Sequence, residues 1–383
     1  LESSFAGEQR AYYTQIGDNA LARLHIIIKT KPGNIPRYKK SHIEADLLDV
    51  TCSWGDSLLE NLTEIYGKEK ALNLYKRYNP AFLPAYKDKF RGNQAAKDIE
   101  NIEQTLNIGK LSMSLFRPET EKSNQFHFKV YHPSQLIPLS DVLPILEDLG
   151  LRVLNEIPYV VHPDSVEDKK VVIHDFGVIT RNGSKVDLVA VRKNFQDTFS
   201  RAWSGEIESD GFNALVLFAG LGWREVMFLR ACCKYLRQVG VAFSQEYMEQ
   251  TLTNNAHISC KIVDLFEARF DPSIEGKSKT ILKRLEIELE KVKSADEDRI
   301  LRRYINLVMS MLRTNFYQTT NNGPKPYLSF KFDSEKIDEL PLPRPFREIY
   351  VYSPKVEGIH LRFGMVARGG LRWSDRREDF RTE

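Results

Sequence analysis

The 383 residues are 42% hydrophobic and 28% charged, which is typical of a soluble globular protein with two or three domains. With 55 basic and 52 acidic residues, the formal charge of +3 is too balanced to indicate a nucleic-acid-binding protein. The longest apolar run, residues 214–221, is about half of the roughly 20 residues that cross a bilayer, so no membrane partner is expected.

The four cysteines show no metal-binding or redox spacing, since neither Cys-x-x-Cys nor a zinc pattern with histidine is present. Neighbouring helix residues point about 100° apart, so Cys232 and Cys233 are predicted to pack as small hydrophobic residues. Few cysteines and the lack of a signal peptide favour a cytoplasmic protein. The first residue, Leu1, is not methionine, which indicates a piece of a longer protein.

The first hundred residues contain one strand pattern followed by helical patterns. We predict a strand at 24–28 and then helices over 57–65, 71–78 and 94–106. Gly67 stands where the first helix should end, and Pro80 follows the second. The third helix is mostly polar, which predicts a surface connector.

From Leu111 the apolar pattern has a period of two, with helical patterns between pairs of strands. The sequence predicts strands and helices in the order 111–116 (strand), 126–131 (strand), 141–149 (helix), 152–161 (strand), 171–179 (strand) and 186–203 (helix). Ser140 is the expected cap of the first helix, and Gly150 its end. Strand–helix–strand–strand–helix is the alternation of ferredoxin-like domains.

This alternation resembles the ACT-type regulatory modules, which bind amino acids. Such modules hold their ligands in the turn from the first strand into the helix, here residues 132–139, which lacks the glycine commonly found there. Two alternatives follow, an assembly scaffold and an amino-acid-binding module, and the scaffold is favoured.

Residues 211–318 are predicted to be almost wholly helical. Gly220 and Gly222 indicate a break between two helices, because a phosphate loop would follow a strand and have a third glycine. A short heptad-like seam covers 280–293, and an apolar stripe from Ile300 to Leu312 continues on the next helix. No convergent polar cluster is expected in this bundle. Period two then returns in strands at 327–332, 348–352 and 358–366.

Six arginines fall in the last 22 residues, at positions 362, 368, 372, 376, 377 and 381. Arginine suits carboxylates because its planar fork donates two parallel hydrogen bonds. Two glycines weaken a strand unless something must approach the backbone closely, so Arg368-Gly369-Gly370 is predicted to bind a ligand. The arginines at 376–381 lie among acids and are predicted to form surface salt bridges.

The segment from Val366 to Glu383 resembles the start of the catalytic domain of the large bacterial NAD-specific glutamate dehydrogenases. The resemblance implies oxidation of L-glutamate to 2-oxoglutarate and ammonium, with hydride passing to NAD. It assigns substrate binding to Arg368, Gly369, Gly370 and Arg372. Smaller glutamate dehydrogenases carry a lysine before this Gly-Gly-Leu-Arg motif, and that lysine contacts a substrate carboxylate, whereas position 368 here is arginine.

The resemblance also implies that the catalytic lysine and aspartate and the NAD-binding domain follow Glu383. No catalytic, cofactor-binding or metal-binding residue is therefore expected in this chain, and the chain alone is expected to be inactive. The expected fold is α+β, comprising an ACT-like region (1–108), an ACT-like module (109–204), a helical segment (205–320) and the start of the catalytic domain (321–383). Allosteric regulation and a homo-oligomer are further expectations.

The alternative hypothesis is a stand-alone amino-acid sensor without catalysis, in which the ACT-like part binds the ligand and the helices transmit the signal. Nucleic-acid binding is disfavoured, because acids are interspersed among the arginines of the C-terminal segment.

Overall fold

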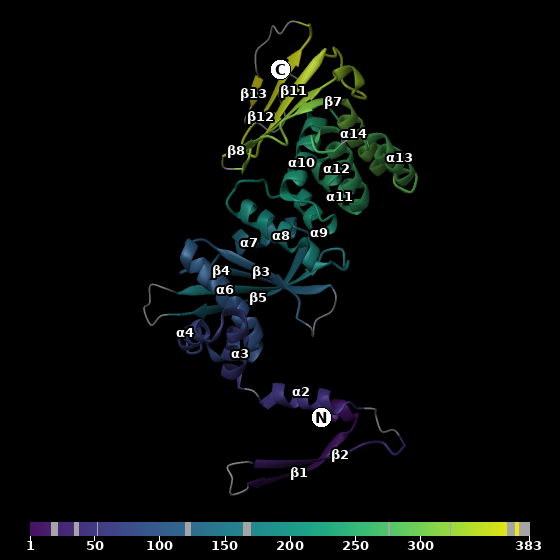
Figure 1. Cartoon of the computed structure of the whole chain (residues 1–383). Coiled ribbons are helices and arrows are strands. Elements are labelled where there is room, and N and C mark those ends of the chain that lie inside the picture. Colours follow the sequence, from purple (N-terminus) through teal and green to yellow (C-terminus); the bar gives the residue numbers. More distant parts are fainter. Residues whose placement is uncertain are drawn as a thin grey trace. The chain divides into compact units, whose positions relative to one another are not determined.

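The computed structural model describes residues 1–16, 22–33, 38–51, 53–118, 124–163, 170–274, 276–321, 323–365 and 372–374. Contacts divide the chain into two compact units. The first contains residues 1–104 and 160–170, and the second contains residues 105–159 and 171–383. Both units mix helices and strands, as expected for an α+β chain (Figure 1).

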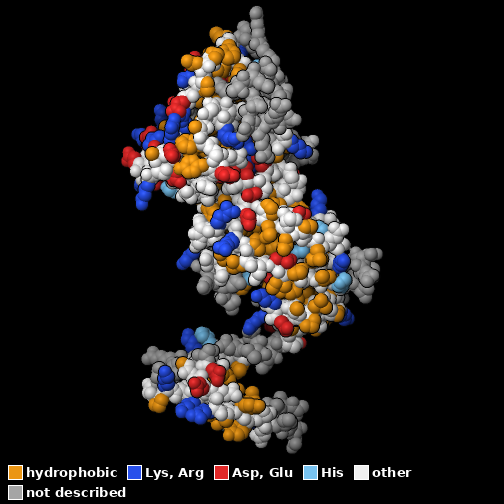
Figure 2. Space-filling model, turned by 180° about the vertical axis from the view of Figure 1, so that it is seen from behind, with side chains coloured by type: hydrophobic (Ala, Val, Ile, Leu, Met, Phe, Trp, Pro, Cys, Tyr) orange, Lys and Arg blue, Asp and Glu red, His pale blue; other side chains and the backbone are white. Residues whose placement is uncertain are grey.

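The first unit begins with a two-stranded antiparallel hairpin, coloured purple in Figure 1. Its elements are α1 (Glu2–Phe5), β1 (Glu8–Ile16) and β2 (Ala22–Lys29), and α2 (Lys40–Thr51) follows. β2 confirms the strand predicted at 24–28, whereas β1 was not predicted because its sequence is mostly polar. Several large hydrophobic side chains of the hairpin are exposed: Tyr12, Tyr13, Leu24 and Ile27. Figure 2 shows hydrophobic side chains on the surface of this part of the chain.

A helical group completes the first unit: α3 (Trp54–Tyr66), α4 (Lys68–Tyr78), α5 (Pro84–Lys89) and α6 (Gly92–Ile108). Gly67 ends α3 with φ +78°, as its position in the sequence predicted. Phe82 and Tyr86 stack with ring centroids 4.3 Å apart inside this group. The prediction that α6 is a surface connector was wrong, since Ile99 and Ile102 are fully buried at helical spacing.

The second unit opens with a four-stranded sheet in the order β3-β4-β6-β5. Its elements are β3 (Ser112–Phe116), β4 (Gln125–Pro133), α7 (Leu139–Asp148), β5 (Leu151–Val161), β6 (Val171–Thr180) and α8 (Leu188–Trp203). Each predicted strand and helix of this region is present. The sheet resembles a ferredoxin-like unit whose edge strand, β3, precedes the βαββα order.

The turn into α7 differs from the prediction. The N-cap position belongs to Pro138, and Ser140 lies inside the first turn with its hydroxyl bonded to Asp141. Gly150 ends the helix with φ +83°, as predicted. Ser134, in the preceding turn, has φ +70°, a left-handed conformation that glycine adopts more easily.

Short helices then form a bundle, coloured teal to green in Figure 1. They are η2 (Gly211–Asn213), α9 (Ala214–Phe218), α10 (Trp223–Gln238), α11 (Gln245–Asn254), α12 (Ala256–Phe270), α13 (Ser278–Leu289) and α14 (Ala295–Ser310). The break predicted at Gly220 and Gly222 separates α9 from α10. The seam of α13 ends at Leu289, earlier than the predicted boundary at residue 293.

A five-stranded sheet in the order β13-β12-β11-β10-β7 follows the bundle. Its strands are β7 (Met311–Thr314), β10 (Leu328–Phe332), β11 (Arg347–Tyr352), β12 (Glu357–Arg362) and β13 (Arg372–Ser374). A small hairpin, β8 (Thr319–Thr320) and β9 (Gly323–Pro324), and η3 (Ser334–Lys336) connect them. All neighbouring strands of the large sheet are antiparallel.

The predicted helix through Leu312 was wrong, because α14 ends at Ser310 and the chain becomes β7. The Asp333 N–H donates to the Ser310 carbonyl at 2.9 Å, and β7 pairs with β10. Pairing with a distant strand therefore overrides the local helical pattern.

One hydrophobic core joins both sheets and the bundle of the second unit. Phe228 of α10 stacks on Phe266 of α12 with centroids 4.0 Å apart, and Tyr235 stacks on Phe332 at 4.5 Å. Helix α10 therefore lies at the centre of this core. Within the described residues, no helix is long and apolar enough to cross a membrane.

Candidate functional site

Of the predicted substrate-binding residues, the structure describes Arg372 alone. Arg368, Gly369 and Gly370 are outside the described residues, as are the arginines at 376–381. Arg372 begins β13, and its backbone pairs with Ile359 of β12. The structure therefore places one of the four predicted residues, by its backbone, on an edge strand beside β12.

Two buried tyrosine–carboxylate bonds hold the strands beside β13, one within the sheet and one between the sheet and α10. The Tyr350 hydroxyl of β11 donates to Glu357 of β12 at 2.9 Å, and the Tyr235 hydroxyl of α10 donates to Glu348 at 2.5 Å. All four side chains are buried. Hydrogen bonds to buried carboxylates are stronger than those at the surface, so they restrict how the sheet can move against the helix.

A buried ion pair on α10 contradicts the expectation that the bundle has no convergent polar cluster. The Arg230 side chain is 0% exposed, and its Nε and Nη2 each donate to an Asp210 carboxylate oxygen at 2.7 Å. Nη2 also donates to Asn213 Oδ1 at 2.7 Å. The remaining nitrogen, Nη1, has no hydrogen-bond partner among the described residues. The neighbouring carboxylates outweigh the effect of burial and raise the pKa of Arg230.

An ion pair one turn further along α10 connects this cluster to the five-stranded sheet. Lys234 Nζ lies 3.3 Å from Glu208 Oε2, and Glu208 Oε1 accepts a hydrogen bond from the Tyr352 hydroxyl at 3.0 Å. Arg230 and Lys234 are four residues apart, so they share a helix face. That spacing, next to the apolar residues 226–229 and 231–233, was the sequence signal for this cluster, and the prediction overlooked it.

Carboxylates outnumber the cations of this cluster. Burial and, to a smaller extent, the nearby charge of Asp210 together raise the pKa of Glu249 to about 7. Burial also raises the pKa of Asp148 and of Glu357. Glu249 therefore binds a proton close to neutral pH. In the part of the chain that the structure describes, no group of His, Cys, Asp or Glu side chains is arranged to hold a metal ion.

The predicted ligand turn, residues 132–139, is tied to the first sheet by a histidine. The Ile137 N–H donates to His174 Nε2 at 3.2 Å, so His174 carries its proton on Nδ1 and donates it to Glu156 at 2.8 Å. In the same turn, His132 Nδ1 is buried with no hydrogen-bond partner within the described ranges. Burial lowers the pKa of His132.

An ACT-like sheet, a helical bundle and an open antiparallel sheet along one chain define a multidomain α+β protein. Family models for glutamate dehydrogenases match it in succession. They are the ACT2 domain at residues 1–55, helical motif 2 at 61–105, the ACT3 domain at 110–191, helical motif 3 at 207–272, and the bacterial NAD-glutamate dehydrogenase catalytic domain at 284–383.

Curated relatives agree with these matches. The chain is 40% identical to an NAD-specific glutamate dehydrogenase of Halomonas elongata and 39% identical to one of Pseudomonas aeruginosa, over 97% of its length in both cases. Identity to the Mycobacterium tuberculosis protein of the same name is 33% over the whole chain. The chain belongs to the large bacterial NAD-specific glutamate dehydrogenases, and it spans 23–25% of the length of these relatives.

Proposed function

We propose that the protein containing this chain oxidises L-glutamate to 2-oxoglutarate and ammonium, with NAD as hydride acceptor. The observation that carries the proposal is the match of the catalytic-domain model across residues 284–383 together with the high identity to the two named dehydrogenases. In this proposal, residues 321–383 belong to the catalytic domain. Residues 1–108 and 109–204 are ACT-like regions, and residues 205–320 are a helical segment between them and the catalytic domain.

Substrate binding is assigned to Arg368, Gly369, Gly370 and Arg372. An arginine fork donates to both oxygens of a carboxylate, and glycines allow the substrate to approach the backbone. The position of Arg372 in β13 supports this assignment, since β13 pairs with β12, β12 pairs with β11, and β11 is bonded to α10. In the free chain, these residues supply only part of a pocket for a dicarboxylate.

The activity is tested by purifying the intact protein that contains this sequence and recording NADH formation with L-glutamate. The expected result is glutamate-dependent reduction of NAD, with little reduction when L-aspartate replaces glutamate. An intact, folded protein that reduces no NAD with glutamate would refute the assignment.

The chain of 383 residues is proposed to be inactive by itself, with a role in regulation and in assembly of a homo-oligomer. Hydride transfer needs a bound nicotinamide, and the sequence has no Gly-x-Gly-x-x-Gly after a strand. The same spectrophotometric assay on residues 1–383 should give no NADH above the rate without enzyme. Turnover by this chain would contradict the proposal.

A second candidate function is amino-acid binding at the turn 132–139. The buried, unpartnered His132 Nδ1 and the left-handed Ser134 favour it, because strained backbone and unsatisfied polar atoms are common at ligand sites. Calorimetric titration of the chain with a panel of amino acids tests this function. A sensor binds one of them with a measurable heat that is lost in His132→Phe, whereas a scaffold binds none.

A further inference from the structure

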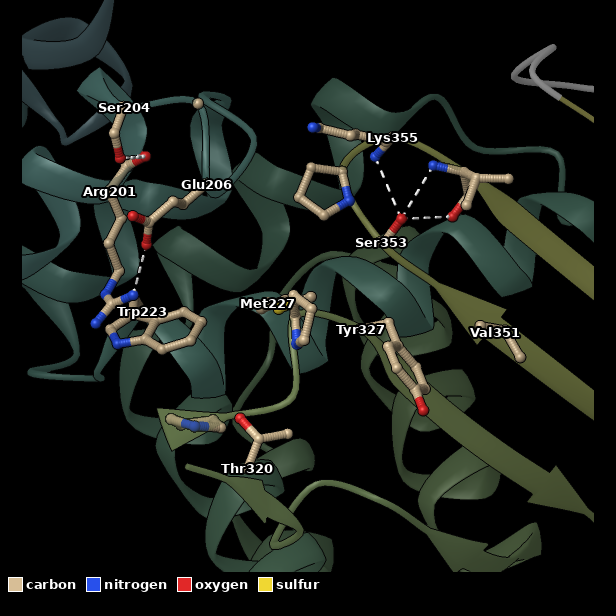
Figure 3. A pocket seen from close by; sticks show the side chains of 15 residues that line it. Arg201, Ser204, Glu206, Trp223, Met227, Thr320, Tyr327, Val351, Ser353 and Lys355 are labelled. Carbon is tan, nitrogen blue, oxygen red and sulfur yellow. Dashed lines mark hydrogen bonds and ion pairs between the residues drawn. The ribbon is translucent and has the colours of Figure 1, made fainter. Parts of the chain in front are cut away.

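A pocket of about 980 Å³ lies in the second unit, between the helices and the five-stranded sheet. Residues from the end of α8, the start of α10, the β8–β9 hairpin and the turn between β11 and β12 line it (Figure 3). Its apolar wall comprises Trp223, Met227, Pro324, Pro326 and Tyr327. A cavity of this size and composition is typical of small-molecule sites.

Two sets of hydrogen bonds hold the walls of this pocket. The Arg224 guanidinium donates to the Phe316 carbonyl at 3.0 Å and to the Lys325 carbonyl at 2.9 Å, which fixes the hairpin segment against the start of α10. On the other wall, the Ser353 hydroxyl donates to the Val356 carbonyl at 3.0 Å. The pocket is therefore largely formed before any ligand binds, which reduces the entropy lost on binding.

The charges around the pocket leave one cation without a counter-charge. Figure 3 shows Arg201 and Glu206 on one side of the pocket, joined by an ion pair of 2.7 Å. Arg201 also lies over the Trp223 ring, 4.2 Å from its centroid. Lys355 is on the other side, is exposed, and forms no ion pair with any acid in the described parts of the chain. The lining thus carries a net positive charge at Lys355.

We propose that this pocket binds a small organic anion with a flat apolar body. The body packs against the aromatic and proline wall, and the anionic group lies at Lys355. Arg201, held by Glu206, keeps the Trp223 ring in place through its cation–π contact. Nucleoside monophosphates and aromatic carboxylates share this chemistry.

Because of the pocket's position, a bound ligand is expected to stabilise the folded chain. Trp223 and Met227 lie in the segment that helical motif 3 matches, whereas Tyr327 and Lys355 lie in the segment that the catalytic-domain model matches. A ligand that touches both segments stabilises their native packing, since it binds only when they are together. Binding is therefore expected to raise the melting temperature of the chain.

The test uses fluorescence titration of the 383-residue chain with anilinonaphthalene sulfonate, a flat aromatic sulfonate. The expected result is saturable binding of one dye per chain, with affinity reduced about tenfold or more in Lys355→Glu, because a charge-assisted contact becomes a repulsion. Lys283→Glu, the same change at an exposed position of α13, is the matched control and should bind as the parent does. Near-ultraviolet circular dichroism establishes that each variant is folded.

Tyr327→Ala provides a second variant that removes part of the apolar wall and leaves Lys355 in place. It should also weaken dye binding and reduce the rise in melting temperature. Competition by adenosine monophosphate and by phenylpyruvate then distinguishes the nucleotide from the aromatic acid. The proposal is overturned if the dye does not bind, if Lys355→Glu and Lys283→Glu bind alike, or if neither competitor displaces the dye.

Discussion

At the scale of single residues, Arg230 shows how a buried charge is held in this chain. Its charge is fully buried and is matched by a bidentate bond to Asp210. Removing one partner of a buried ion pair leaves the other partner charged and without water around it. The resulting loss of stability is larger than the stability that the intact pair adds relative to apolar side chains in its place. Arg230 therefore fixes the segment before η2 against α10.

Arg230→Ala is predicted to lower the free energy of unfolding by about 3 kcal/mol, because the partly buried Asp210 loses its cation. The double variant Arg230→Met/Asp210→Leu should recover most of this loss. Urea unfolding of the 383-residue chain gives both values, with exposed Arg284→Ala as the control expected to change stability little. Equal destabilisation by the single and double variants would show that the charge itself is not the cause.

Glu249 gives the second prediction at this scale. Its pKa is about 7 in the folded chain, against an ordinary value of 4.5, so the folded state binds the proton more tightly than the unfolded state does. This contribution is fully present below pH 4.5 and is lost as the pH rises towards 7. Glu249→Gln should flatten the pH dependence of stability over that interval and stabilise the chain above pH 7.

The measurement is urea unfolding across this pH interval for the parent chain, Glu249→Gln and the matched control Glu246→Gln. Glu246 is exposed on the same helix and should leave the profile unchanged. If the stability of Glu249→Gln depended on pH as the parent's does, burial and Asp210 would not be the cause of the raised Glu249 pKa.

At the scale of elements, sequence patterns predicted the ACT-like strands and helices well because alternation and capping signals are local. Gly67 and Gly150 end their helices as expected, each with positive φ. β7 was missed because its apolar residues continue a helical stripe, and only pairing with β10 determines its conformation. The Arg230 cluster was missed for a related reason, since its partners come from separate segments. Arg368 itself lies outside the described residues, so its role rests on the sequence alone.

The turn before α7 supplies a prediction at the same scale. Ser134 has φ +70°, which costs a residue with a side chain about 1–2 kcal/mol. Ser134→Gly should raise the free energy of unfolding by about 0.5–1 kcal/mol, after the greater freedom of glycine in the unfolded chain is counted. Ser140→Gly, inside α7, should change it by a similar amount in the opposite direction. Thermal unfolding of the two variants measures both changes in stability. A loss of stability in Ser134→Gly would contradict the left-handed conformation of Ser134.

At the scale of the whole molecule, the chain places an ACT-like sheet and a helical bundle before the five-stranded sheet. Helix α10 is the common support, because it contacts the large sheet through Tyr235 and the segment before η2 through Arg230. The segment after α8 also contacts the large sheet directly, because Glu208 accepts a hydrogen bond from Tyr352 of β11. The proposed binding of glutamate by this chain depends on the substrate contact assigned to Arg368.

The most direct test is the kcat/KM for L-glutamate of the intact protein carrying Arg368→Met, compared with Arg376→Met as the matched control. Loss of a bidentate contact to a substrate carboxylate should lower kcat/KM by about 100-fold, whereas the control should stay within a few-fold of the parent. A folded Arg368→Met enzyme that retains the parent's kcat/KM for glutamate would contradict the account.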